Sequence, residues 1–336
     1  ALTREHLVLV FISIFFAVLI GVPLGILLTR KKSLQSPVLG IANILQTIPS
    51  LALFGLLIPI SFIGGIGAKT AVIALTLYSF LPIIRNTVTG ISGVDAKTRE
   101  AAVAMGMTDW QILRMVELPL SAPVILTGIR VAVVIAVGVA TVAAAVGAGG
   151  LGTYIFRGLR QNDNNLLLAG AISSAVLALF LDFALGQFEK SFDYKRRAEN
   201  SRRKFIALGA LALIAAIFGA NLIQNPKSKI QNQAVRVGSK DFTESIILAE
   251  ILAQMLEKRG IAVERKFELG GNLAHDALAS DNLDVYPEYT GTAFTAILKQ
   301  KPITDTQQVY NETKRQYAEK FALNVSPPLG FSNDFA

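Results

Sequence analysis

The sequence predicts an all-α membrane domain of about six transmembrane helices, followed by a smaller domain in which strands and helices alternate. Hydrophobic residues make up 52% of the 336 residues and only 17% are charged, whereas globular chains carry about 25% charged residues. The apolar residues crowd into the first two thirds of the chain, and the remainder has the composition of a soluble domain. In that remainder, strand-like runs alternate with amphipathic stretches, which is typical of a parallel α/β sheet.

Six apolar stretches approach the roughly 20 residues that a helix needs to cross a bilayer. They are residues 7–28, 39–63, 70–91, 124–146, 166–188 and 205–223. Pro49 and Pro59 interrupt the second stretch, and the third contains Pro82. Asp182 lies in the fifth, and we interpret it as interfacial rather than as part of a pathway, because a carboxylate is costly in lipid. The chain begins at Ala1 without Met, so we expect upstream residues to be missing and the first span to be a retained anchor.

Basic residues orient these spans. They cluster in three loops, at residues 30–32, 97–114 and 190–204, which follow the first, third and fifth spans. Strict alternation puts all three loops on one side, which the positive-inside rule makes cytoplasmic, so both ends lie outside. The net charge of +8 is therefore explained by membrane topology, and we expect a lipid environment and no nucleic-acid partner. The chain has no cysteine, which excludes a disulfide framework and a thiolate site.

The cytoplasmic loop at residues 95–120 has the periodicity of two short helices. Asp95 and Thr108 are candidate N-caps, Gly106 ends the first helix, and Pro119 is expected to stop the second. The expected apolar face of the first helix consists of Ala101, Ala102 and Met105. Small residues allow close approach to a groove, and the carboxylate of Glu100 can accept hydrogen bonds from its wall. The loop is therefore predicted to be a docking hairpin.

This hairpin resembles the EAA loop of ABC importer permeases. The matching residues are Glu100, Ala101, Ala102, Gly106, Val116, Leu118 and Pro119. The resemblance implies a MetI-like permease fold, in which six of these residues couple the spans to a separate cytoplasmic ATPase: Glu100, Ala101, Ala102, Gly106, Leu118 and Pro119. No phosphate-binding P-loop motif occurs in the sequence. We therefore expect ATP and Mg to be bound by the partner, and no cofactor, catalytic residue or metal site in this chain. The resemblance also implies a second permease copy in a homodimer.

The predicted domain organisation has four parts. Residues 1–204 form a transmembrane domain with five spans, residues 205–224 the sixth span, residues 225–234 a linker and residues 235–336 the α/β domain. In the last part we expect strands at 235–238, 262–269 and 284–289, and helices ending near residue 258, over 273–279 and opening at 290–292. Ligands bind beyond the carboxyl ends of parallel strands, so the candidate binding segments are residues 239–245, 270–272 and 286–292. His275 is interpreted as a satisfied helix residue rather than a ligand.

The tail resembles the substrate-binding proteins of betaine, choline and carnitine importers. The resemblance is carried by GSKDFTE at 238–244, GG at 270–271, YPEYTGT at 286–292 and PPLGFSN at 327–333. It implies substrate contacts at Tyr289, Thr292, Asn333, Phe335 and Ser245. Phe335 stands where tyrosine is common, and Ser245 where glutamine is common. A two-lobed receptor of this kind would need about 170 more residues, so we expect the first part of a periplasmic-binding-protein type lobe.

The two resemblances together imply an ATP-driven importer. Quaternary-ammonium compounds such as glycine betaine, choline, carnitine or ergothioneine carry a cation without a donor proton, which suits aromatic faces at about 0.5–2 kcal/mol per contact. A ligand carboxylate would suit helix N-terminal amides. We therefore predict a permease subunit of a bacterial plasma membrane with a fused extracytoplasmic receptor. The alternatives are a ligand-sensing membrane receptor without transport, and an importer of an amino acid or a metal.

Overall fold

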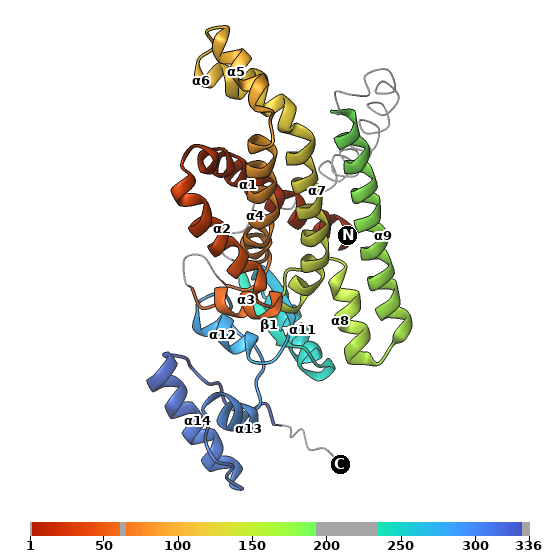
Figure 1. The fold of residues 1–336 in the computed structure, drawn as a ribbon. Coiled ribbons are helices and arrows are strands. Elements are labelled where there is room, and N and C mark those ends of the chain that lie inside the picture. The colour runs from red at the N-terminus through yellow and green to blue at the C-terminus, as the bar shows by residue number, and fades with distance from the viewer. Residues whose placement is uncertain (1, 61–64, 193–233, 331–336) are drawn as a thin grey trace. The chain divides into compact units, whose positions relative to one another are not determined.

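The computed structural model describes residues 2–60, 65–192 and 234–330, which belong to two compact units (Figure 1). The first unit is Ala1–Lys229 and the second is Ile230–Ala336. Among the described residues, the regular secondary structure of the first unit is all helical, and the strands lie in the second.

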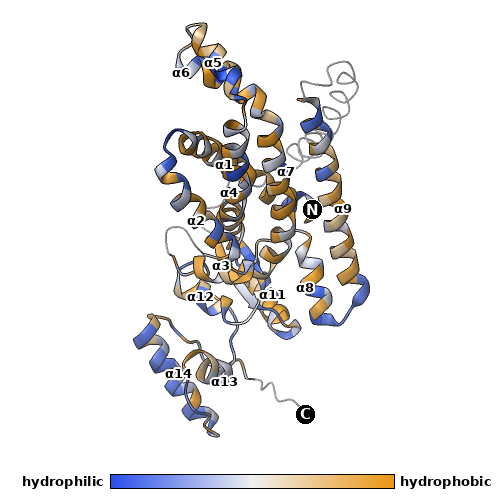
Figure 2. Ribbon diagram, in the orientation of Figure 1, coloured by the Kyte–Doolittle hydropathy of each residue, from blue (hydrophilic) through white to orange (hydrophobic). Residues whose placement is uncertain are grey.

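Four long apolar helices dominate the first unit. They are α1 (Leu2–Arg30), α4 (Ala68–Ser92), α7 (Leu118–Ala143) and α9 (Asn164–Ser191). Each is long and apolar enough to cross a membrane, and Figure 2 shows hydrophobic residues along all four. They correspond to the predicted first, third, fourth and fifth spans. The sixth predicted span, at residues 205–223, lies outside the described residues.

The second predicted span is broken. Helix α2 (Lys32–Thr47) and helix α3 (Ser50–Leu57) meet at a bend of 101°, so together they count as a fifth candidate span or as a re-entrant segment. Pro49 occupies the N-cap position of α3. The Tyr78 hydroxyl of α4 donates to the carbonyl of Ile48 at the bend, which satisfies a backbone acceptor that the broken helix leaves free.

Helix α4 packs between α1 and α7 at glycines. A Cβ on Gly25 of α1 would lie 2.6 Å from the Cβ of Thr87, and one on Gly128 of α7 would lie 2.7 Å from the carbonyl oxygen of Pro82. Both distances are shorter than any ordinary contact, so the helices approach this closely because these positions lack a side chain. The core of the first unit is thus the α1–α4–α7 layer.

Two sequence predictions for this unit are wrong. The sequence analysis predicted no helix between the fourth and fifth spans, but residues 147–165 contain α8 (Gly152–Gln161), which packs against α9. Pro119 does not stop a helix: α6 (Asp109–Ile112) continues through a π-helical turn (Leu113–Glu117) into α7. The Leu118 N–H bonds to the Leu113 carbonyl, and the next residue is the proline, whose missing N–H falls where the helical register changes. A 3₁₀ turn (Ala144–Val146) ends this long helix.

The second unit contains a parallel sheet, as predicted. Strand β1 (Val235–Lys240) pairs in parallel with β2 (Val263–Leu269), with a register shift between Gly238 and Lys240. Helix α11 (Thr243–Lys258) connects the two strands and α12 (Leu273–Ala279) follows β2. The predicted third strand is reduced to one parallel bridge between Val237 and Val285. Pro287, two residues on, has no N–H to extend that ladder.

The end of the described chain is helical. It comprises α13 (Thr290–Thr292), a π-helical turn (Ala293–Ile297) and α14 (Thr306–Phe321), the last of which the sequence analysis did not predict. Their buried residues form one cluster: Ala293, Phe294, Leu298, Val309 and Tyr317.

Candidate functional site

The predicted cytoplasmic loop forms a capped helical hairpin at one end of the first unit (Figure 1). Helix α5 (Ala96–Ala104) begins at Asp95, whose side chain accepts from the Lys97 N–H at 3.4 Å. Helix α6 begins at Thr108, whose N–H donates to Gln111 Oε1 at 2.8 Å while its hydroxyl accepts from the Gln111 N–H, forming a capping box. Gly106, with φ +77°, turns the chain between the helices. Both predicted caps are confirmed.

The expected apolar face of α5 is not packed inward. Ala102 is buried, whereas Ala101 and Met105 are exposed, with Met105 73% accessible. Other large apolar side chains of the hairpin also face outward: Val103, Trp110 and Met115. A shallow groove beside them is lined by Ala96, Arg99, Glu100, Val103 and Ala104. An exposed apolar patch beside the exposed carboxylate of Glu100 is typical of a protein-docking surface.

The remaining predicted coupling residues lie at the base of the hairpin. Leu118 is half-buried and Pro119 is exposed at the start of α7. Between them and the hairpin lies Glu117, a fully buried carboxylate that pairs with Arg30 of α1 and Arg99 of α5. Sequence reasoning missed this cluster. The feature that could have indicated it is the acidic residue directly before the Leu118–Pro119 pair. Because Arg30 follows the first span, the contact places the first two basic loops at the same end, as the alternation of loops predicts.

A second charged cluster joins α7 to α9. Arg130 donates through Nε and Nη2 to both oxygens of Asp182, each at 2.6 Å, and its Nη1 lies 3.4 Å from Glu189. The Thr127 hydroxyl donates to the other Glu189 oxygen at 2.8 Å. A Cβ on Gly186 would lie 3.0 Å from the guanidinium carbon, so the guanidinium packs over a helix position without a side chain. Asp182 therefore faces a protein partner, Arg130, that the sequence analysis did not identify.

In the second unit, two aromatic rings meet beyond the end of β1. The ring of Tyr289 lies 5.4 Å from that of Phe242, centroid to centroid. Tyr289 is the N-cap residue of α13, and Thr292, three residues later, is exposed. Phe242 belongs to the turn at 239–245, so two of the three predicted binding segments are in contact. Sequence reasoning placed Phe242 within a motif but not among the site residues.

Buried charges fix the segment that carries Tyr289. Glu288 accepts from Lys240 Nζ at 2.5 Å and from the Tyr289 N–H at 2.8 Å through one oxygen, and from the Tyr286 hydroxyl at 2.8 Å through the other. Tyr286 is buried, and this burial together with the Glu288 charge raises the pKa of its hydroxyl. Of the two tyrosines, Tyr286 is therefore the core residue and Tyr289 lies nearer the surface.

The other predicted binding residues are placed differently. Ser245 is fully buried, and its hydroxyl accepts from the Lys240 N–H at 2.9 Å, so it closes the turn after β1. Asn333 and Phe335 lie outside the described residues. His275 packs edge-on against the rings of Tyr317 and Phe321, but it is not satisfied as expected: its buried Nδ1 has no hydrogen-bond partner among the described residues.

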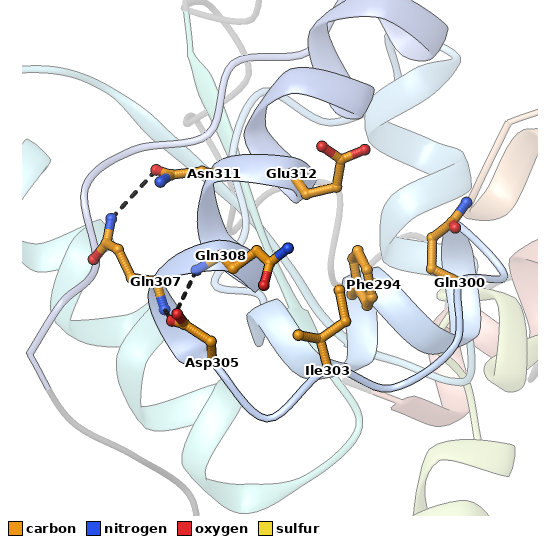
Figure 3. A pocket seen from close by; sticks show the side chains of 8 residues that line it. All are labelled: Phe294, Gln300, Ile303, Asp305, Gln307, Gln308, Asn311 and Glu312. Atoms are coloured by element: carbon orange, nitrogen blue, oxygen red, sulfur yellow. Dashed lines mark hydrogen bonds between the residues drawn. The ribbon is translucent and has the colours of Figure 1, made fainter.

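A hollow of about 530 Å³ lies beside α14 (Figure 3). Its lining comprises Phe294, Gln300, Ile303, Asp305, Gln307, Gln308, Asn311 and Glu312, none of which the sequence analysis singled out. Asp305 is engaged as the N-cap of α14, accepting from the Gln307 and Gln308 N–H groups. Within residues 2–60, 65–192 and 234–330, no three His, Cys, Asp or Glu side chains come together in a way that could hold a metal ion.

Both units match families of known proteins. Residues 21–194 match the family described as the binding-protein-dependent transport system inner membrane component. The osmoprotectant import permease protein OsmW of Salmonella typhimurium is 50% identical over 191 residues, which is 56% of this chain and 89% of that protein. The chain belongs to this transport family. Residues 233–336 match a second family, the substrate binding domain of the ABC-type glycine betaine transport system.

Other relatives extend the match. The ergothioneine transport permease/ergothioneine binding protein EgtU of Helicobacter pylori is 35% identical over 97% of this chain, which spans 59% of the length of EgtU. A crystal structure of the inward-facing MetNI methionine ABC transporter shares the fold of the first unit, with TM-score 0.53 and 28% identity over 57% of this chain and 94% of the matched chain. The first unit is thus a MetI-like inner-membrane permease domain, and the second is an extracytoplasmic substrate-binding domain. The family implies transport rather than catalysis, a separate ATPase and a dimeric arrangement.

Proposed function

We propose that this chain is the fused permease and receptor of an ATP-driven importer of quaternary-ammonium compounds. One observation carries the proposal: a permease domain and a glycine-betaine-type binding domain follow each other in a single chain. The fused protein EgtU matches 97% of this chain. OsmW and the carnitine permease OpuCD of Listeria monocytogenes, which is 48% identical over 190 residues, support the osmoprotectant class.

The aromatic pair at the end of β1 supports a cationic ligand. A trimethylammonium group has no proton to donate, so it is held by ring faces rather than by acceptors. Tyr289 and Phe242 supply two such rings, and Glu288 fixes the backbone of Tyr289. In the proposed complex, Thr292 adds a polar contact, and Asn333 and Phe335 complete the site. Ser245 contributes by closing the β1 turn, which holds Phe242 in place.

The hairpin supports the proposed partner. A cytoplasmic ATPase subunit would receive α5 in a cleft, with Glu100, Ala101 and Gly106 at the contact. Ala102, expected there from the sequence, is buried within the permease and does not reach the contact. The exposed apolar side chains there, Val103, Met105 and Trp110, would be covered by this subunit. Two copies of the permease form the proposed homodimer, and the partner binds ATP and Mg.

Ligand titration of the full-length protein tests the substrate class. Glycine betaine, choline, carnitine, ergothioneine and methionine are added in turn, and tyrosine fluorescence or heat of binding is measured. Saturable binding of at least one trimethylammonium compound is expected, and Tyr289→Ala weakens it about tenfold while Tyr289→Phe stays within about threefold. The substrate class would be refuted if none of the four trimethylammonium compounds (glycine betaine, choline, carnitine and ergothioneine) bound.

The same experiments distinguish two alternative functions. Import of an amino acid is favoured by the likeness of the first unit to a methionine transporter, and it predicts that methionine alone binds. A ligand sensor without transport would bind a ligand but show no uptake in proteoliposomes that contain the ATPase and ATP.

A further inference from the structure

One carboxylate connects the hairpin to the long helices. Glu117 is fully buried where the π-helical turn passes into α7. Its Oε1 accepts from Arg99 Nε at 2.8 Å and from Arg30 Nη1 at 3.3 Å, and its Oε2 accepts from Arg30 Nη2. Arg99 also donates through Nη2 to the carbonyl of Ile91, at 3.2 Å. The cluster of Arg30, Arg99 and Glu117 therefore joins α1, α4, α5 and α7.

We propose that Glu117 is a positioning residue that transmits displacement of α5 to α1. The proposal rests on the importer function proposed above, because an ATPase must move α5 for the connection to matter. The hairpin is covalently continuous with α4 through the 92–95 turn and with α7 through the π-helical turn. Helix α1 has no such continuity, since Arg30 and Glu117 are 87 residues apart in sequence. Helix α1 packs on α4 and α7, and the ion pair with Arg30 adds a direct polar connection from the hairpin to the end of α1.

The chemistry of the cluster makes this connection stiff. Hydrogen bonds between guanidinium groups and a carboxylate are short and directional. The Glu117 carboxylate is fully buried, whereas the side chains of Arg30 and Arg99 are 43% and 36% exposed, so water is excluded on the carboxylate side of the bonds. A buried carboxylate that loses its partners has no water to replace them. Arg99 and Glu117 therefore move together when α5 moves. Few other side chains of α5 pack against the rest of the permease: Ala102 is buried, but Ala101, Val103, Ala104 and Met105 are exposed.

A purely structural role would give a different result from a coupling role. If Glu117 serves only to hold the fold, Glu117→Gln lowers the yield of folded protein and its binding of the ATPase. Any folded complex would then transport normally for each ATP hydrolysed. If Glu117 transmits motion, the folded complex binds ATPase and nucleotide but α1 fails to respond.

The experiment reads the response of α1 directly. The chain has no cysteine, so Leu27→Cys places a single bimane label on an exposed position of α1, one turn before Arg30. The full-length protein with its ATPase in nanodiscs is trapped with ATP and vanadate, and trapped nucleotide is measured together with the bimane emission shift. In Glu117→Gln we expect normal nucleotide trapping and an emission shift reduced about fivefold or more. The matched control, Arg114→Gln, removes an exposed arginine of the same turn and should leave the shift unchanged.

A full emission shift in Glu117→Gln would overturn the proposal. Should that variant not fold, Arg99→Lys, which keeps the charge but loses the Nε contact, is expected to reduce the shift about threefold. A full shift in Arg99→Lys would overturn the proposal equally. Uptake of glycine betaine, choline, carnitine and ergothioneine is measured in parallel. If the wild-type protein shows a nucleotide-dependent shift but takes up none of these four compounds, the substrate proposal fails while the fluorescence result still decides the role of Glu117.

Discussion

Arg130→Leu removes the guanidinium that lies between two carboxylates of α9. Arg130 sits near the middle of α7 and makes a bidentate pair with Asp182, while Glu189 lies farther away and keeps its hydrogen bond from Thr127. Burying the α9 segment inside a bilayer requires that the Asp182 charge be paired or neutralised. The substitution should therefore weaken the docking of α9 on α7.

The expected magnitude follows from the position of Asp182. An unpaired Asp at the centre of a membrane helix costs about 3 kcal/mol on insertion scales, which corresponds to roughly a hundredfold change in the docking equilibrium. Because Asp182 lies in the C-terminal third of α9, this value is the upper bound. Glu189 contributes less, because it lies two residues from the end of α9. Replacing both members of the pair, Arg130→Leu with Asp182→Leu, removes the charge as well as its partner and should recover stability to within about 1 kcal/mol of wild type.

Thiol labelling measures this equilibrium. A cysteine at Ala184, a buried position on α9, is protected from maleimide while α9 is docked, and its labelling rate reports the fraction undocked. The parent protein carries only Ala184→Cys. Adding Arg130→Leu should speed labelling up to about a hundredfold. The double variant should label near the parent rate, and Arg114→Leu should leave the rate unchanged. The reasoning is refuted if Arg130→Leu labels at the parent rate, or if the double variant labels as fast as Arg130→Leu.

Three further predictions test other parts of the structure. Gly152→Ala should destabilise the permease by about 2 kcal/mol or more in a detergent unfolding assay, because the added Cβ would lie 1.9 Å from a backbone oxygen of α7. Gly138→Ala, which adds its Cβ into open space, should be neutral in that assay. Burial lowers the pKa of His275, so the unfolded chain binds the proton more readily and the free energy of unfolding of the binding domain should fall as the pH drops below about 6.5. His275→Phe should abolish that dependence in chemical denaturation followed at about pH 7.5 and about pH 5.5, and an unchanged dependence would show that another group titrates. Trp110→Ala should reduce co-purification of the ATPase about tenfold without lowering thermal stability, whereas Leu159→Ala, equally exposed on α8, should have no effect.

Local chemistry made much of this protein predictable from its sequence. The apolar stretches at residues 7–28, 70–91 and 166–188 lie within α1, α4 and α9, since span length and hydropathy are properties of the segment itself. The caps at Asp95 and Thr108 were predictable for the same reason. The parallel pairing of β1 with β2 was predictable because a helix separates the two strands in sequence. Short amphipathic segments were less so: α8 and α14 were missed because they are too brief or too polar to stand out beside the spans.

Tertiary structure alone decided which side chains meet. From the sequence, Glu117 is one acid in a polar loop and Asp182 one acid in an apolar span, and nothing nearby identifies Arg30 or Arg130 as their partners. The packing of α1 and α9 against α7 brings these charges together across 87 and 52 residues. The contact of Phe242 with Tyr289 likewise depends on the chain returning to β1 at Val285. A sequence determines where charge and apolar surface lie along the chain, whereas only the fold determines which charge is buried and what neutralises it.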